Sequence, residues 1–233
     1  MTSAKAALQG VIGRLLFRDA TVTRVEDLGP HFRRLVLSGP ALRGVTWTPG
    51  DKLQIFLPGI GTRAYTPLRW DAGTGETELL AYLHGEGPGS QWARTVKPGA
   101  AIQVFGPRGS LVVGGTPPAV VIGDETSLAL ARANGAPERT VLEVTDTGET
   151  RAALDALGLS GATLVARQSN EAHREVLVEA VANALQAHPG APLVLSGRAA
   201  AIQGVRQGLK ARGIGLASVK AKAYWAPGKV GLD

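Results

Sequence analysis

Hydrophobic and polar residues alternate along the first half of the chain in short runs that are typical of β-strands. Gly- and Pro-containing turns, such as Thr48-Pro49-Gly50 and Lys97-Pro98-Gly99, separate these runs. The pattern predicts strands at 20–26, 32–38, 52–57, 63–69, 77–84 and 101–105, with a short helix at 90–96. Six short strands at this spacing favour a small antiparallel β-barrel.

The pattern changes after the Gly- and Pro-rich segment 114–118. Continuous apolar runs, expected of strands buried on both faces, follow at 119–122, 140–144, 163–166 and 193–195. Helical stretches alternate with them at 127–133, 149–157, 171–187 and 199–212. This alternation is typical of a parallel α/β sheet. We therefore expect a barrel domain over residues 1–115 and a nucleotide-binding-like α/β domain over residues 116–233.

The composition excludes several kinds of site. The chain of 233 residues has no cysteine, which rules out disulfides, iron–sulfur clusters and thiolate zinc sites. Its four histidines have no metal-ligand spacing, so no metal site is expected. No apolar run approaches 18 residues and no secretory signal is evident, which predicts a cytoplasmic protein without membrane insertion.

Charge is distributed unevenly around a net value of +6. Residues 1–115 carry 13 Lys and Arg against 8 Asp and Glu, residues 116–197 carry 5 against 10, and residues 198–233 carry 7 against 1. The two basic parts predict surfaces that attract anions, although ordinary solvated faces would give the same counts. Nucleic acid is not the expected partner, because no run of Lys and Arg is longer than two and no RNP-type aromatic pattern occurs.

Two local motifs can bind a flat, phosphorylated ligand. In Arg63-Ala64-Tyr65-Thr66 the guanidinium offers a fork for phosphate oxygens, and the Tyr ring, on the same strand face, can shield a flat ring. In the segment 84–93, His-Gly-Glu-Gly-Pro-Gly-Ser-Gln-Trp-Ala, glycines allow close approach and Pro88 suits the start of a helix whose free N–H groups can bind pyrophosphate. Taken alone, the first motif also fits an ordinary edge strand and the second a flexible hairpin tip.

Four motifs in order resemble one family. Arg63-Ala64-Tyr65-Thr66, the segment 84–93, Gly106-Pro107-Arg108-Gly109 and Gly123-Asp124-Glu125-Thr126, with the ending Tyr224-Trp225-x-x-Gly228, are similar to the siderophore-interacting proteins. These are flavin-dependent ferric-siderophore reductases of the ferredoxin-reductase superfamily. The resemblance implies an antiparallel six-stranded FAD-binding barrel followed by a parallel-sheet NAD(P)-binding domain, with FAD and either NADPH or NADH as cofactors.

The resemblance also implies roles for individual residues. Arg63 is expected on FAD phosphate, Tyr65 on the isoalloxazine and Thr66 near its N5, so Tyr65 and Thr66 are the predicted catalytic residues. The predicted cofactor-binding set is Arg63, Ala64, Tyr65, Thr66, Leu83, His84, Gly87, Pro88, Gly89, Ser90, Trp92, Asp124, Thr126 and Trp225. The chain departs from the family pattern at Leu68, where many members have a second Arg, and at Arg198, where many have Glu.

The predicted activity is transfer of electrons from NAD(P)H through FAD to a ferric siderophore, with release of Fe(II). Two alternatives stay open: a flavin reductase for another acceptor, and a non-enzymatic flavin- or siderophore-binding module. A basic rim of Arg69, Lys220 and Lys222 is the predicted substrate site, because Lys220 and Lys222 share a strand face with Tyr224. An edge strand protected by lysines would show the same pattern. We expect a monomer, since no long apolar surface stripe is evident.

Overall fold

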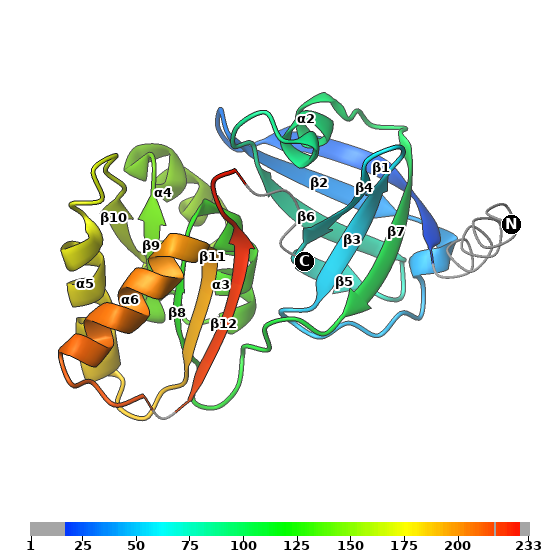
Figure 1. Cartoon of the computed structure of the whole chain (residues 1–233). Helices are drawn as coiled ribbons and strands as arrows, with labels where there is room; N and C mark the ends of the chain where they lie inside the picture. Colours follow the sequence, from blue (N-terminus) through cyan, green and yellow to red (C-terminus); the bar gives the residue numbers. More distant parts are fainter. Residues whose placement is uncertain (1–16, 217, 229–233) are drawn as a thin grey trace, which may run out of the picture.

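The computed structural model describes residues 17–216 and 218–228, which form two sheets side by side (Figure 1). The first sheet is antiparallel and has seven strands in the order β4-β3-β7-β1-β2-β6-β5. Its strands are β1 (Arg18–Asp27), β2 (Phe32–Ser38), β3 (Lys52–Leu57), β4 (Gly61–Tyr65), β5 (Pro67–Asp71), β6 (Glu76–Tyr82) and β7 (Ala101–Arg108). Helix α2 (Pro88–Thr95) lies between β6 and β7 in the chain.

The sheet has seven strands and not six, because the segment 63–69, predicted as one strand, is divided between strands β4 and β5. Strand β4 pairs with β3 and β5 pairs with β6, so they are the two edge strands of the sheet. Thr66 alone separates them. The sheet therefore curls until its two edges meet at Thr66, where the chain passes from one edge to the other. Pro67 has no N–H to continue the β4 ladder, which explains why the pairing changes there.

The interior of the curled sheet is a cluster of buried aliphatic side chains. Leu35, Leu53, Ile55, Leu79 and Val104 are fully buried in it. Alternate burial along β7 shows the two-residue period of a strand with one face on the core. The barrel expected from the alternating pattern is confirmed, although ladder pairing does not close it between β4 and β5.

The second sheet is parallel and has the strand order β10-β9-β8-β11-β12. Its strands are β8 (Val120–Gly123), β9 (Thr140–Val144), β10 (Thr163–Ala166), β11 (Leu193–Arg198) and β12 (Val219–Trp225). Its α-helices are α3 (Leu128–Asn134), α4 (Thr147–Ala156), α5 (Arg174–Ala187) and α6 (Ala199–Ala211). The order reverses between β8 and β11, and in open α/β sheets ligands bind outside the carboxyl ends of the strands at such a point.

Helices cover both faces of this sheet. Residues on α5 and α6 pack with Val120, Ile122 and Leu195 on one face. Alternate residues of the same strands, Val121 and Val194, pack on the other face with α3. The continuous apolar runs in the sequence follow from this two-sided burial.

The two domains share a core where they meet. Phe32 and Leu68 of the barrel are buried in the same cluster as Leu128, Leu142 and Leu154 of the second domain. Beside it, the backbone N–H of His31 donates to Glu149 Oε1 at 2.5 Å. The cleft between the domains therefore has a packed floor. The predicted boundary after residue 115 stays a prediction; the segment that contains it joins the last strand of one sheet to the first of the other.

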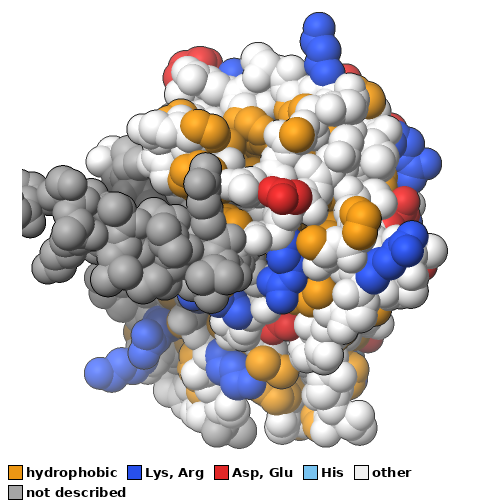
Figure 2. Space-filling view, turned by 90° about the vertical axis from the view of Figure 1, so that its right-hand side faces the viewer, with side chains coloured by type: hydrophobic (Ala, Val, Ile, Leu, Met, Phe, Trp, Pro, Cys, Tyr) orange, Lys and Arg blue, Asp and Glu red, His pale blue; other side chains and the backbone are white. Residues whose placement is uncertain are grey.

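The surface of the barrel that faces away from the second domain carries mixed charge. Lys and Arg side chains stand among Asp, Glu and hydrophobic side chains over the described atoms visible in Figure 2, without gathering into one patch. No described helix combines the length and the apolar character that crossing a membrane requires.

Candidate functional site

A cavity of ≈ 250 Å³ lies between the barrel and the second domain. Three of its lining residues are Lys or Arg, and none is Asp or Glu. The lining residues are Lys52, Arg63, Ala64, Tyr65, Thr66, Leu80, Tyr82, His84, Gly87, Pro88, Gly89, Ser90, Ser110, Thr126, Ala129, Lys222, Tyr224 and Trp225. A cavity with this charge and no carboxylate suits an anionic ligand.

Arg63 and Tyr65 form one wall with the start of helix α2. They lie two residues apart on β4 and so point to the same face of the strand. The Tyr65 hydroxyl donates to the Gly89 carbonyl at 3.4 Å, and a Cβ added at Gly89 would come within 3.4 Å of the Arg63 side chain. Burial raises the pKa of the Tyr65 phenol, so this ring stays neutral. Gly89 thus allows the helix to approach the two side chains closely.

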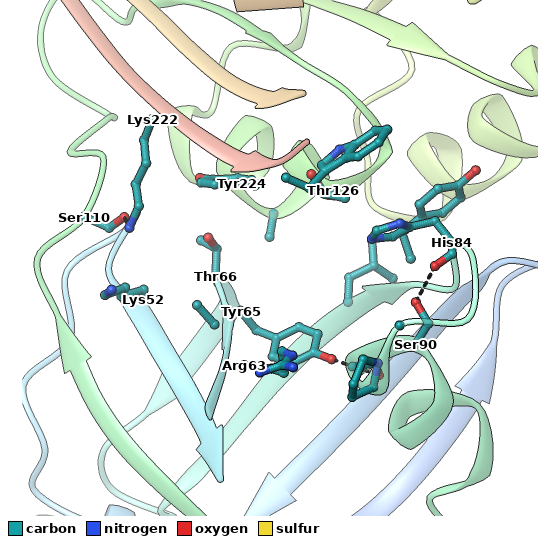
Figure 3. A pocket seen from close by; sticks show the side chains of 18 residues that line it. Lys52, Arg63, Tyr65, Thr66, His84, Ser90, Ser110, Thr126, Lys222 and Tyr224 are labelled. Carbon is teal, nitrogen blue, oxygen red and sulfur yellow. Dashed lines mark hydrogen bonds between the residues drawn. The ribbon is translucent and has the colours of Figure 1, made fainter. Parts of the chain in front are cut away.

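The first turn of α2 has free backbone donors. Its N-cap residue is Gly87, no side chain caps it, and Pro88 occupies the first position. The Ser90 hydroxyl donates to the His84 carbonyl at 2.7 Å (Figure 3), so its proton closes the 84–90 loop. The predicted helix is confirmed at this place, and its uncapped N–H groups are the donors that phosphate groups use at helix N-termini.

A second basic group lies on the other side of Thr66. Figure 3 shows Lys52, Lys222 and Ser110 to one side of Thr66, with His84 and Ser90 to the other. The Lys222 ammonium donates to the Ser110 hydroxyl at 3.3 Å. Lys52 and Ser110 line the cavity but were not among the site residues predicted from the sequence. The one sequence signal for Lys52 is its position at the start of a predicted strand, two residues after a Pro-Gly turn.

Asp124 supports the cavity wall from behind. Its carboxylate is fully buried and accepts hydrogen bonds from the Thr126 N–H at 2.9 Å, the Thr126 hydroxyl at 2.5 Å and the Trp225 indole N–H at 2.7 Å. Burial raises the pKa of Asp124 to about 6, against the opposing effect of these bonds. Asp124, predicted to bind cofactor, does not line the cavity, whereas Thr126 and Trp225 do.

Gly197 leaves the space that Asp124 occupies. It has a φ of +86°, and an added Cβ would lie 2.5 Å from the Asp124 carboxyl carbon. Any side chain there would collide with a buried charged group and would be strained in its own backbone. The glycine at the end of β11 is therefore part of the support for Trp225.

Aromatic rings connect the two domains at the edge of the cavity. The His84 ring lies 5.4 Å from that of Trp225, and Tyr82 stacks on His84 at 5.9 Å. The Arg167 guanidinium stands 5.7 Å from the Trp225 ring centre, close enough for a cation–π contact. Burial lowers the pKa of His84, so the imidazole here is neutral at neutral pH.

Several other predicted site residues lie elsewhere. Leu83 and Trp92 pack in a small cluster between β6 and α2, where the Trp92 ring lies 6.0 Å from that of Tyr65. Arg69 forms an ion pair with Glu78 at 2.8 Å and a second with Glu76. Lys220 is exposed and does not line the cavity, unlike Lys222 on the same strand. Of the predicted substrate residues, only Lys222 reaches the cavity.

Comparison with known proteins agrees with this geometry. Residues 59–111, which carry β4, β5, β6, α2 and β7, match the family model of the siderophore-interacting FAD-binding domain. A siderophore-interacting protein, SipS, from Aeromonas hydrophila superposes with a TM-score of 0.72 at 25% identity, over 92% of this chain and 93% of that one. The chain is thus similar in fold to siderophore-interacting proteins. A siderophore utilization protein from T. fusca superposes with a TM-score of 0.70, also at 25% identity, over 93% of this chain and 95% of the other.

One curated relative is named as a ferric-chelate reductase. The NADPH-dependent ferric-chelate reductase of Escherichia coli (strain K12) is 37% identical over 128 residues, which are 45% of this chain and 50% of the reductase. The matched part thus spans about half the length of that relative. The resemblance drawn from the ordered motifs is confirmed, as is the fold class of a barrel followed by a parallel α/β domain.

Proposed function

We propose that the protein is a flavoenzyme that transfers electrons from NAD(P)H through FAD to a ferric siderophore or similar anionic ferric chelate. One NAD(P)H supplies a hydride, that is two electrons, and two ferric ions each take up one, leaving NAD(P)⁺ and a proton. One observation carries the proposal: the cavity built around the Arg63–Thr66 motif is lined by three Lys or Arg residues and by no Asp or Glu.

The cavity walls have the groups that FAD requires. Arg63 and the uncapped first turn of α2 are next to each other, so a cation and free N–H donors are available together for the pyrophosphate. Tyr65 offers a neutral ring as a flat wall. FAD, when bound, accepts two electrons as hydride and passes them on singly, which suits an iron(III) acceptor.

The chain's own residues would position the cofactor and shield it. Thr66 lies in neither β4 nor β5, so its side chain stands in the gap between the edge strands. Trp225 and Thr126 form the facing wall and are fixed by Asp124. This wall comes from the second domain. Because the buried cluster shared by the two domains joins them, the distance between this wall and the barrel wall is fixed. Such fixed positioning is the main contribution that a protein makes to cofactor chemistry.

Lys52 and Lys222 are the residues we assign to the anionic substrate. Both line the cavity on the side away from Arg63 and α2, so they are separate from the groups assigned to the pyrophosphate. This replaces the rim of Arg69, Lys220 and Lys222 expected from the sequence, because Arg69 is paired with acids and Lys220 is outside the cavity.

Reduction of an anionic ferric chelate tests the proposal, with Fe(II) trapped by a coloured ferrous chelator. Lys52→Gln and Lys222→Gln are each expected to lower kcat/KM for the anionic chelate roughly tenfold, through loss of attraction that 0.5 M salt also screens. Lys220→Gln is the matched control from the same strand and should stay at the wild-type value.

A neutral quinone should be reduced equally by all four proteins, since it gains nothing from the two ammonium groups. A protein that takes up no FAD, or lysine variants that affect the quinone and the chelate alike, would contradict the proposal. The cytoplasmic location and the monomeric state stay predictions from the sequence, and light scattering of the purified protein checks the second.

A further inference from the structure

Three arginines stand at the carboxyl edge of the parallel sheet, where dinucleotides bind in this type of fold. Arg167 follows β10, Arg174 begins α5 and Arg198 ends β11. Within residues 116–197, all described, the remaining arginines bond backbone carbonyls at the opposite edge: Arg132 to Leu157, Arg139 to Pro118, and Arg151 to Ser160 and Ala162. Among residues 116–198, the arginines at the carboxyl edge are therefore Arg167, Arg174 and Arg198.

Arg198 is already bound on two sides by carboxylates. Its Nε and Nη2 donate to Glu143 at 2.6 and 3.0 Å, and its Nη1 and Nη2 donate to Glu171 at 2.6 and 2.9 Å. Its side chain is only 7% exposed. A guanidinium held by two bidentate partners has no fork left for a phosphate.

Arg167 and Arg174 are also engaged. Arg167 donates to Glu125 Oε2 at 3.0 Å and to the Thr145 hydroxyl at 2.8 Å, and it pairs again with Glu143. Arg174 makes one ion pair, with Glu171 at 3.3 Å, and its side chain is 50% exposed. Glu125 and Glu143 are buried, so the carboxylate of this group that solvent reaches is that of Glu171, with a side chain 32% exposed.

Glu171 is held in an unusual conformation. Its φ of 61° is a left-handed value that non-glycine residues seldom adopt, and its carboxylate accepts two bonds from Arg198. The bond from Arg198 lowers the pKa of Glu171 to about 2, so this carboxylate is ionised at every working pH. Its neighbour His173 adds no donor toward a ligand, since Nδ1 accepts from the Gln168 N–H and Nε2 faces Glu143.

We propose that the protein uses NADH in preference to NADPH, and that Glu171 determines this preference. The inference rests on the proposed function and concerns its electron donor. In dinucleotide-binding sheets a carboxylate at this edge accepts the ribose 2′-hydroxyl of NADH, whereas an available Arg accommodates the 2′-phosphate of NADPH. Here Glu171 pairs with both Arg198 and the half-exposed Arg174, so the carboxylate that can accept a ribose hydroxyl also neutralises the cations that would attract a 2′-phosphate. The Escherichia coli relative, named as NADPH-dependent, would differ in this respect.

Steady-state kinetics with both nucleotides measure the preference. The FAD-loaded wild type should show a kcat/KM for NADH at least about tenfold above that for NADPH. Glu171→Gln keeps the side-chain size and can still accept from Arg198, but it removes the negative charge that neutralises Arg198 and Arg174. We expect it to shift the ratio toward NADPH by roughly tenfold. Glu179→Gln is the matched control, because Glu179 loses the same charge farther along α5, where it pairs with Arg212.

A binding measurement gives a second readout that does not depend on turnover. ADP-ribose should raise the thermal midpoint of the wild type more than 2′-phospho-ADP-ribose does, and Glu171→Gln should narrow that difference while Glu179→Gln should not. A wild type that prefers NADPH, or two Gln variants that behave alike, overturns the inference and leaves the proposed reductase intact. Failure to oxidise either nucleotide, in a protein that holds FAD, would instead contradict the proposed function.

Discussion

Replacing Trp225 with Phe tests whether Asp124 fixes the wall of the cavity that comes from the second domain. The change removes the indole N–H that donates to Asp124 at 2.7 Å and leaves a fully buried carboxylate with fewer donors. A hydrogen bond to a charged group contributes about 1.5–3 kcal/mol to stability. We therefore expect Trp225→Phe to lose about that much beyond the cost of the smaller ring.

Trp47 offers a matched control for the ring itself. Its indole nitrogen is buried but has no acceptor among the described residues. Trp47→Phe removes the same atoms without breaking a hydrogen bond, and it relieves an unsatisfied donor. The difference between the two variants isolates the bond to Asp124. Urea unfolding followed by far-ultraviolet circular dichroism measures both free energies of unfolding in the FAD-free protein.

The difference between the variants should depend on pH. Burial raises the pKa of Asp124 from 3.8 to about 6, so the folded protein binds the proton more tightly than the unfolded chain. The contribution of this carboxyl group to the free energy of unfolding is therefore complete below about pH 4. As the pH rises through about 6, the protein loses about 3 kcal/mol of that contribution. Asp124→Asn should lack this part of the pH dependence.

Loss of the indole donor makes ionisation of Asp124 harder still, so the pKa of Asp124 in Trp225→Phe lies higher than in the wild type. At pH 8 the deficit of Trp225→Phe should be that of a charged bond, and at pH 5 that of a neutral one, about 0.5–1.5 kcal/mol. A deficit that is the same at both pH values, or a Trp47→Phe variant that loses as much, would refute the reasoning.

Two further variants test other parts of the site. Arg63→Ala should weaken FAD binding by about 1.5–3 kcal/mol in a fluorescence titration, because a charged donor to phosphate is lost. The control is Arg94→Ala, which should not weaken it, because Arg94 is exposed and makes only long contacts with Glu86 at 3.7 Å and the Gly85 carbonyl at 3.5 Å. Equal losses in the two variants would remove Arg63 from the phosphate site. Gly197→Ala should destabilise the fold by roughly 1–3 kcal/mol or more, since its Cβ would lie 2.5 Å from Asp124 at a positive φ. A thermal midpoint equal to that of the wild type would show that Asp124 can be displaced without loss of stability.

Much of the architecture was predictable from local pattern. Period-two alternation identified the barrel strands, and continuous apolar runs identified strands β8 to β11. A strand buried on one face alternates apolar and polar residues, whereas a strand buried on both faces is apolar throughout. The motif at 63–66 and the Gly-Pro start of α2 were visible for the same reason: each depends on neighbours in sequence. The 63–69 segment was predicted as one strand because both halves have strand character, and only pairing with β3 or β6 separates them.

The tertiary structure decided which side chains share a space. Lys52 and Lys222 are 170 positions apart in numbering, and they line one cavity because β3 and β12 belong to domains packed together. Asp124 stands in a motif that suggests ligand contact, yet complete burial turns it into a support for Thr126 and Trp225. Arg198 and Arg69 are cations in the sequence, but carboxylates from other strands and loops neutralise them. A sequence determines the local propensity and the charge of each residue, whereas burial and pairing depend on long-range contacts that only the folded chain establishes.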